Sequence, residues 1–395
     1  MDSELISENL GNPGRGATVK KILVLLLVCF SLFFCFSATA SALTVDAASC
    51  ILIDAATGRV LFENNAHQAL PPASTTKMLT ALLALESGMD LSEQITLPED
   101  FVNVGESGIN LKAGETLSME DLLYALMLRS ANDAAQAIAI SVSGSEEAFM
   151  EKMNARTAQL GLTDSHWQNP HGLDEQNHLA SAYDLAIIAR EALTIPFFNE
   201  LIATDRWSLP WAANDFNRIL YNHNQFLTLY DGADGVKTGY TALAGNCLVG
   251  SATRDGMRLI GVVMNCPDQT HYAQMTLLMD YGFANYEPLV LGNKGDVLGK
   301  VKVVKGDLSE VDAVLGDDIV IAVAKGETVE TTPALDLPRT IKAPCTRENP
   351  IGSISYSDGS GNTVIAPLYL KDCVERYTFP IVIQSVWQSV VDAFF

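Results

Sequence analysis

The sequence is short of basic side chains. Its 395 residues contain 25 Lys and Arg against 47 Asp and Glu, and the formal net charge is −22. A surface this negative repels nucleic acid and offers no electrostatic attraction toward anionic lipids. We therefore predict that no nucleic acid or other polyanion is a partner.

Cysteine is also scarce, and none of the seven is in a Cys-x-x-Cys spacing. Cys29 and Cys35 lie in the N-terminal region, which leaves an odd number for the rest of the chain. This pattern argues against a full disulfide framework and against a zinc site, and no cluster supports a metal or cofactor. We predict mostly buried free thiols, with a bridge between Cys345 and Cys373 as the alternative. The five cysteines in question are Cys50, Cys247, Cys266, Cys345 and Cys373.

Long apolar runs are missing as well. The run 22–36 follows Lys20 and Lys21 and precedes the small residues 38–42, a pattern typical of a secretory signal cleaved after Ala40 or Ala42. An uncleaved membrane anchor is the alternative. In both cases we expect the remainder of the chain to be exported. The last residues, 380–395, form an amphipathic pattern too short to span a bilayer. We predict that this tail lies on a membrane surface, and packing on its own domain is the alternative.

The pattern of apolar and turn residues predicts an α/β (α+β) fold. A hairpin is expected over 50–63, helices over 92–206, strands over 235–239, 246–250 and 257–264, and a closing helix over 273–283. This order predicts an antiparallel sheet built from both ends of the domain with a helical region inserted. Short alternating runs after Tyr286 predict a small all-β sandwich domain. The expected divisions are a signal peptide (1–42), a mixed α/β domain (43–284), the all-β domain (285–376) and an amphipathic helix (377–395).

Ser74 and Lys77 stand three residues apart at the start of a predicted buried helix. Pro71 and Pro72 precede an apolar stretch, and Gly88 is placed to cap its end. Side chains at i and i+3 share one face, so the two can meet. A serine hydroxyl becomes a nucleophile when a base takes its proton, and lysine is such a base when burial or a second cation lowers its pKa.

Two further stretches make this pair specific. Ser130-Ala131-Asn132 lies between two helical runs, and Lys237-Thr238-Gly239 lies on a predicted strand. The ordered set Ser-x-x-Lys, Ser-x-Asn and Lys-Thr-Gly occurs in penicillin-binding proteins and serine β-lactamases. With other stretches the sequence, over about 45–376, resembles the D-alanyl-D-alanine carboxypeptidases, which are low-molecular-mass penicillin-binding proteins. These stretches are 53–58, 105–107, 114–115, 121–123, 130–133, 169–173 and 234–241.

The resemblance implies a serine D-Ala-D-Ala carboxypeptidase with a β-lactamase-like catalytic domain. Ser74 would attack the carbonyl of the penultimate D-alanine, and Lys77 would accept its proton. Ser130 would relay a proton to the leaving nitrogen, and Asn132 would hold the substrate amide.

The strand motif implies the substrate-binding side of the same site. Lys237 would help to keep Lys77 neutral and, with Thr238, would bind the terminal carboxylate. Gly239 would let the substrate lie close along the strand edge. The backbone N–H groups of Ser74 and Tyr240 would form the oxyanion hole.

The implied partners are a peptidoglycan pentapeptide and β-lactam antibiotics, at the outer face of the cytoplasmic membrane or in the wall. The chain departs from the family at 270–272, where it has Thr270-His271-Tyr272 while many relatives have an arginine that assists the substrate carboxylate. Because a lysine occupies the position of the base, four histidines are expected to be structural or loop residues. They are His171, His178, His223 and His271.

Two other functions fit parts of the pattern. A class A β-lactamase would need a glutamate in a loop after Ser-x-Asn, but the similar stretch 99–103 comes before Ser130. An antibiotic sensor that acylates and stops would normally have a transmembrane signalling segment, and none is evident after residue 42.

Overall fold

The computed structural model describes residues 43–211, 216–359, 361–377 and 387. The predicted signal peptide and nearly all of the predicted C-terminal helix lie outside these residues. Among the described residues, no helix combines the length and the apolar character needed to cross a membrane.

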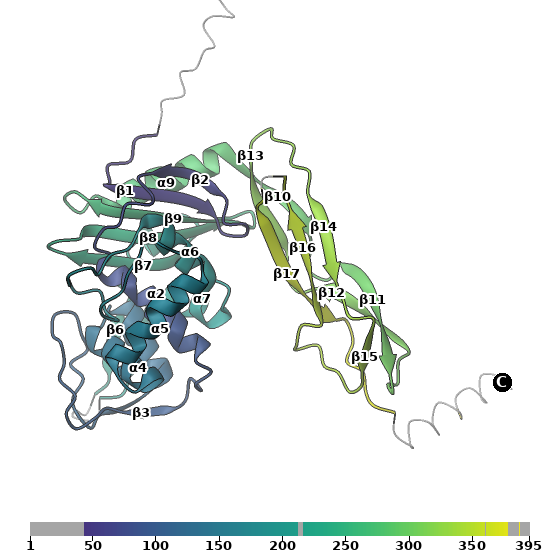
Figure 1. The fold of residues 1–395 in the computed structure, drawn as a ribbon, viewed down its shortest axis with the longest axis horizontal. Coiled ribbons are helices and arrows are strands. Elements are labelled where there is room, and N and C mark those ends of the chain that lie inside the picture. The colour runs from purple at the N-terminus through teal and green to yellow at the C-terminus, as the bar shows by residue number, and fades with distance from the viewer. Residues whose placement is uncertain (1–42, 212–215, 360, 378–386, 388–395) are drawn as a thin grey trace, which may run out of the picture. The chain divides into compact units, whose positions relative to one another are not determined.

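The first part of the described chain is organised around a five-stranded sheet in the order β2-β1-β9-β8-β7. All neighbouring strands are antiparallel, and β1 from the start of the domain pairs with β9 from its end, for example Ile51 with Val262. The prediction that both ends of the domain build one sheet is confirmed (Figure 1). The strands are β1 (Ser49–Asp54), β2 (Val60–Asn64), β7 (Ala233–Thr241), β8 (Gly245–Arg254) and β9 (Met257–Cys266).

Helices cover both faces of this sheet (Figure 1). On one face α9 packs so tightly that a Cβ at Gly261 would lie 2.6 Å from Met275 Sδ. On the other face lies α2, whose residues from Lys77 to Ala84 are all buried, as the apolar pattern predicted. The helices are α2 (Lys77–Glu86), α3 (Met119–Leu128), α4 (Asn132–Ser143), α5 (Glu146–Gln159), α6 (Ala182–Ala192), α7 (Pro196–Ala203), α8 (Phe226–Leu229) and α9 (His271–Asn285).

Local sequence signals account for several helix starts. Ser118 accepts a hydrogen bond from the backbone N–H of Asp121 at the start of α3, and Ser181 does the same for Asp184 at the start of α6. The helical region also contains a short hairpin that the pattern did not predict, β3 (Gln94–Thr96) with β4 (Thr116–Ser118). A second short pair, β5 (Arg206–Leu209) with β6 (Arg218–Tyr221), precedes β7.

From Tyr286 to Tyr377 the helices and strands that the structure describes are all strands, in agreement with the predicted all-β domain. A two-stranded sheet, β10-β13, and a six-stranded sheet, β14-β16-β17-β12-β11-β15, share a buried apolar core that includes Ile321 and Leu368. The strands are β10 (Tyr286–Gly292), β11 (Val297–Val304), β12 (Glu310–Leu315), β13 (Ile319–Ala324), β14 (Thr332–Asp336), β15 (Thr340–Lys342), β16 (Gly352–Ser357) and β17 (Thr363–Leu370).

The five described cysteines are all free thiols. Cys50, Cys247 and Cys266 are buried, and burial raises the pKa of each, to about 11, 11 and 12 respectively. Cys345 is partly exposed and Cys373 is exposed, and no bridge joins them. A buried thiol with a raised pKa has little thiolate at neutral pH, so the three buried cysteines act as small apolar side chains.

Candidate active site

Ser74 lies in a tight turn at the start of α2. The turn, η1 (Ala73–Thr76), is a 3₁₀ helix, and the α-helix itself begins at Lys77. Ser74 was expected in the first α-helical turn, and the structure places it one turn earlier in the tighter geometry. Ala73 has a left-handed φ of +49°, which is costly for a residue with a side chain and typical of a functional turn.

Lys77 Nζ lies at the centre of three polar contacts. It is 3.0 Å from Ser74 Oγ, 2.7 Å from Asn132 Oδ1 and 2.5 Å from the backbone oxygen of His171. Asn132 Oδ1 and the backbone oxygen of His171 can only accept hydrogen bonds. A neutral amine has two N–H donors and one lone pair, so these donors match the two acceptors. The lone pair then faces the Ser74 hydroxyl, which is the arrangement a general base needs.

The electrostatics of the site favour this neutral amine. Burial, and then the nearby Lys237 cation, lower the pKa of Lys77 well below its usual range, while Asp133 and Glu106 oppose the shift. Burial also lowers the pKa of Lys237, to about 7. Both lysines are almost fully buried. Lys77 is therefore suited to take a proton and Lys237 to carry the positive charge.

The loop that supplies the His171 oxygen approaches η1 very closely. Gly172 has a φ of +91°, and a Cβ there would lie 1.9 Å from the Ala73 backbone oxygen. Thr80 Oγ1 donates to the Pro170 oxygen at 2.6 Å, and Asn169 Oδ1 accepts from the Gly172 N–H at 2.7 Å. The stretch 169–172, which carried part of the family resemblance, thus holds the third partner of Lys77.

Ser130 has a left-handed backbone with a φ of +56°. It lies between α3 and α4, as predicted, and its side chain is nearly buried. Among the described residues, its Oγ has no hydrogen-bond partner. A strained backbone that holds an unpartnered hydroxyl in the site leaves that hydroxyl free for a substrate.

Asn132 is held by a loop as well as by Lys77. Its Nδ2 donates to the Gly105 oxygen at 3.1 Å, and its backbone N–H donates to the Ser107 oxygen at 2.8 Å. One amide hydrogen remains for a substrate. The neighbouring Asp133 carboxylate accepts from the backbone N–H groups of Ile109 and Leu111, so it fixes the same loop.

The predicted strand motif lies on β7, which is an edge of the sheet. Lys237 Nζ donates to the Thr238 oxygen at 3.0 Å. A Cβ at Gly239 would lie 3.0 Å from the Ser74 nitrogen, so glycine lets the strand pack against η1. Tyr240 is 67% exposed at the rim. An unpaired strand edge beside the nucleophile offers backbone groups to an extended peptide.

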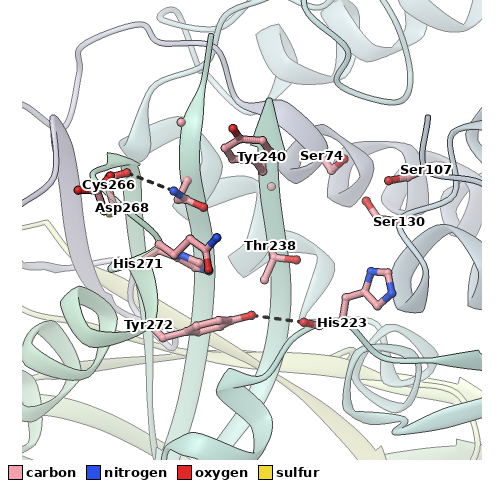
Figure 2. A pocket seen from close by; sticks show the side chains of 14 residues that line it. Ser74, Ser107, Ser130, His223, Thr238, Tyr240, Cys266, Asp268, His271 and Tyr272 are labelled. Carbon is pink, nitrogen blue, oxygen red and sulfur yellow. Dashed lines mark hydrogen bonds between the residues drawn. The ribbon is translucent and has the colours of Figure 1, made fainter. Parts of the chain in front are cut away.

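These elements surround a cavity of about 670 Å³. Figure 2 shows Ser74, Ser107 and Ser130 together on one side of it and His271 and Tyr272 on another. The resemblance had not assigned Ser107 or His223 to the site, because neither belongs to a catalytic triplet. The lining residues are Ser74, Ser107, Ser130, His223, Thr238, Gly239, Tyr240, Gly245, Asn246, Cys266, Asp268, Gln269, His271 and Tyr272.

The four histidines divide into two pairs. His171 and His178 are buried, and burial lowers their pKa to about 3 and 4, so both are neutral. His178 contacts Thr76 Oγ1 at 2.9 Å and supports η1. His223 and His271 line the cavity, which their expected role as structural or loop residues did not include. His271 and Tyr272 occupy the stretch 270–272, which has no arginine.

Fold and site together define a serine acyl-transfer enzyme of the penicillin-binding class. The D-alanyl-D-alanine carboxypeptidase family matches residues 36–268, and the penicillin-binding protein 5 C-terminal domain matches residues 286–376. The chain belongs to the D-alanyl-D-alanine carboxypeptidase family, whose members are serine peptidases.

Individual relatives agree along nearly the whole chain. D-alanyl-D-alanine carboxypeptidase DacF of Bacillus subtilis is 34% identical over 345 residues, covering 86% of this chain and 88% of the relative. DacC of Escherichia coli is 30% identical, with 91% and 92% covered. The crystal structure of penicillin binding protein 5 from Haemophilus influenzae has a TM-score of 0.61 at 29% identity, covering 84% of this chain and 98% of that one.

Proposed function

We propose that this protein removes the terminal D-alanine from peptidoglycan stem peptides through an acyl-enzyme on Ser74. The observation that carries the proposal is the Lys77 amine, which is buried, has a lowered pKa and lies 3.0 Å from Ser74 Oγ between two acceptor-only oxygens. A neutral lysine can donate to the Asn132 and His171 oxygens and turn its lone pair to the Ser74 hydroxyl, and a neutral lysine is the base that this chemistry requires.

In the acylation step, Ser74 Oγ bonds to the carbonyl carbon of the penultimate D-alanine and its proton passes to Lys77. The backbone N–H groups of Ser74 and Tyr240 stabilise the oxyanion. The C–N bond to the terminal D-alanine then breaks, and the leaving nitrogen receives a proton through the unpartnered Ser130 hydroxyl. Lys77 returns to its neutral form by supplying that proton.

In the deacylation step, water attacks the ester carbonyl and gives a proton to Lys77. The ester bond to Ser74 Oγ breaks, and the proton returns to the serine. The second amide hydrogen of Asn132 holds the substrate amide throughout. Before the C–N bond breaks, Lys237 and Thr238 bind the terminal carboxylate at the edge of β7, where Gly239 leaves room for the peptide.

The same site accounts for β-lactams as ligands. A β-lactam presents a strained amide carbonyl and a carboxylate, so Ser74 would open the ring and retain it as an ester. Covalent labelling by penicillin should map to a peptide containing Ser74 by mass spectrometry. An adduct on another residue, or the same adduct in Ser74→Ala, would contradict the assigned nucleophile.

We also propose that residues 1–42 export the protein and that the tail, 377–395, holds it at the outer face of the membrane. The apolar run 22–36 with its small-residue boundary supports export. The aromatic-rich apolar side of the tail supports peripheral attachment. The proposed place of action is the cell wall side of the cytoplasmic membrane.

A further inference from the structure

Arg129 and His223 form a contact beside the active-site cavity. Arg129 directly precedes Ser130 at the end of α3, and His223 lies in the loop between β6 and α8. Arg129 Nη1 donates to His223 Nε2 at 2.5 Å. His223 lines the cavity with Ser130 and Thr238, which is visible in Figure 2.

The loop around His223 is fixed on both sides. Asn222 Nδ2 donates to the backbone oxygens of Ile202 and Thr204 at 3.1 and 3.0 Å. Tyr272 Oη donates to the His223 oxygen at 3.3 Å, and the His223 N–H donates to the Leu128 oxygen at 3.1 Å. The imidazole is therefore held in place before any ligand arrives, which lowers the entropic cost of binding.

The contact with Arg129 determines what His223 can offer. A guanidinium only donates, so His223 Nε2 must accept and the imidazole proton lies on Nδ1. Within the described residues, Nδ1 has no hydrogen-bond partner. Desolvation, then Arg129 and Lys237, lower the pKa of His223, in line with a neutral ring. His223, a lining residue of the cavity, thus has an unpartnered N–H donor and a guanidinium on the other ring nitrogen.

Few cations are available in this chain to bind an anionic substrate end. The net charge is −22, Lys77 serves as the base, and Lys237 has a pKa of about 7. The region 270–272 brings His271 and Tyr272 to the cavity and no arginine. Arg129 supplies a guanidinium that contacts the cavity-lining His223.

We propose that His223 binds the terminal carboxylate of the substrate opposite Thr238, and that Arg129 positions and polarises His223 for this task. The inference rests on the proposed carboxypeptidase function and adds the specificity-determining residue for a free C-terminal carboxylate. Arg129 is a positioning residue, because it acts through the imidazole. Arg129 and His223 together would thus bind the substrate carboxylate in place of an arginine at 270–272, which this chain does not have.

The test compares two peptides that both end in D-Ala-D-Ala, one with a free carboxylate and one with a C-terminal amide. We expect His223→Ala to raise the KM for the carboxylate peptide about 10- to 100-fold, the loss typical of a hydrogen bond to a charged group, with a smaller change in kcat. The kcat/KM for the amide peptide should be nearly unchanged. Arg129→Gln should lower the carboxylate preference, and Arg129→Lys should restore part of it.

Controls separate recognition from folding. His67→Gln and Arg206→Gln change residues outside the cavity and should leave both peptides unaffected, and His223→Gln covers the case in which the alanine variant does not fold. Equal losses on both peptides, or an unchanged preference for the carboxylate in the folded variants, would overturn the inference. Wild-type protein that cleaves neither peptide would instead refute the carboxypeptidase function itself.

Discussion

At the residue scale, the proposed mechanism needs two buried lysines in different protonation states. Lys77 has two acceptors and one hydroxyl around its amine, and the Lys237 cation helps to keep it neutral. Lys237 is buried too, but its task in the proposed mechanism needs its charge. The two groups therefore impose opposite requirements on pH.

This opposition predicts a bell-shaped pH dependence of kcat/KM. Activity should rise with pH as Lys77 loses its proton, and should fall above about pH 7 as Lys237 in the free enzyme loses its own. A bound carboxylate favours the charged lysine, so the alkaline limb of kcat should lie at higher pH than that of kcat/KM. Steady-state kinetics from pH 5 to about 10 measure both limbs.

A charge-preserving substitution provides the control. Lys237→Arg keeps its cation at all working pH values, so any activity that it retains should show no alkaline limb near pH 7. An alkaline limb at the same pH in wild type and Lys237→Arg would contradict the assignment of that limb to Lys237.

The sequence was informative about these residues because each catalytic triplet is local. Ser74, Lys77, Ser130, Asn132 and the β7 triplet could all be predicted, and the structure brings them together. The His171 oxygen could not, because any residue has a carbonyl and only the fold shows which one meets Lys77 across 94 positions. The Arg129 contact with His223 is equally long-range and leaves no local pattern.

At the element scale, two loops support the site. The loop 169–173 brings its oxygen to Lys77, and the loop 103–111 holds Asn132. Neither loop has the periodicity that predicts a helix or strand, so the resemblance indicated their importance without showing their contacts. Their close packing makes them sensitive to small substitutions.

Gly172→Ala should damage both stability and activity. The added Cβ would lie 1.9 Å from the Ala73 oxygen. The alanine would also have to adopt the left-handed φ of +91°, which alone costs about 1–2 kcal/mol. Displacing the His171 oxygen from Lys77 should lower kcat about 100-fold. Urea unfolding and D-alanine release measure the two effects.

Gly161→Ala is the matched control, because Gly161 has a φ of +73° and nothing within 4 Å of its Cβ position. It should lose only the stability due to backbone strain and keep its activity. If Gly172→Ala behaved like Gly161→Ala, the close approach of the two loops would not matter for catalysis.

Asp133→Asn should loosen the loop 103–111. The amide has one acceptor oxygen where the carboxylate accepts from Ile109, Leu111 and Asn103, and an unpaired buried donor costs about 1–3 kcal/mol. We expect kcat/KM to fall about tenfold or more in the folded fraction, because Asn132 loses its support. The fall in kcat/KM is measured as specific activity, with the fraction of folded protein determined by circular dichroism.

Asp184→Asn changes another buried carboxylate, at the start of α6, outside the cavity. It should lower stability while the folded protein stays fully active. Equal specific activities for the two variants would show that Asp133 has only a general structural role.

At the scale of the whole molecule, the fold could be predicted from element order, since the strands predicted at both ends of the helical region do pair in one antiparallel sheet. The exact strand lengths depended on pairing: β8 and β9 both extend beyond the stretches predicted from apolar pattern. The small hairpins β3-β4 and β5-β6 were missed, because strands of three or four residues carry too little pattern.

Deleting residues 378–395 should release the exported protein from membranes and leave peptide cleavage unchanged. The apolar residues of the tail add area for the interface, and the cavity described above is lined by residues between Ser74 and Tyr272. Sedimentation with vesicles of neutral lipid, for full-length and truncated protein, measures attachment. Continued sedimentation of the truncated form would show that the tail is not the anchor.

The most direct test of the account is release of free D-alanine from a soluble peptide ending in D-Ala-D-Ala, using protein without residues 1–42 and 378–395. We predict release by the wild type and none above background by Ser74→Ala, while both proteins have the same circular dichroism spectrum. Release by Ser74→Ala at the wild-type rate, or no release by a folded wild type, would contradict a carboxypeptidase that uses Ser74 as its nucleophile.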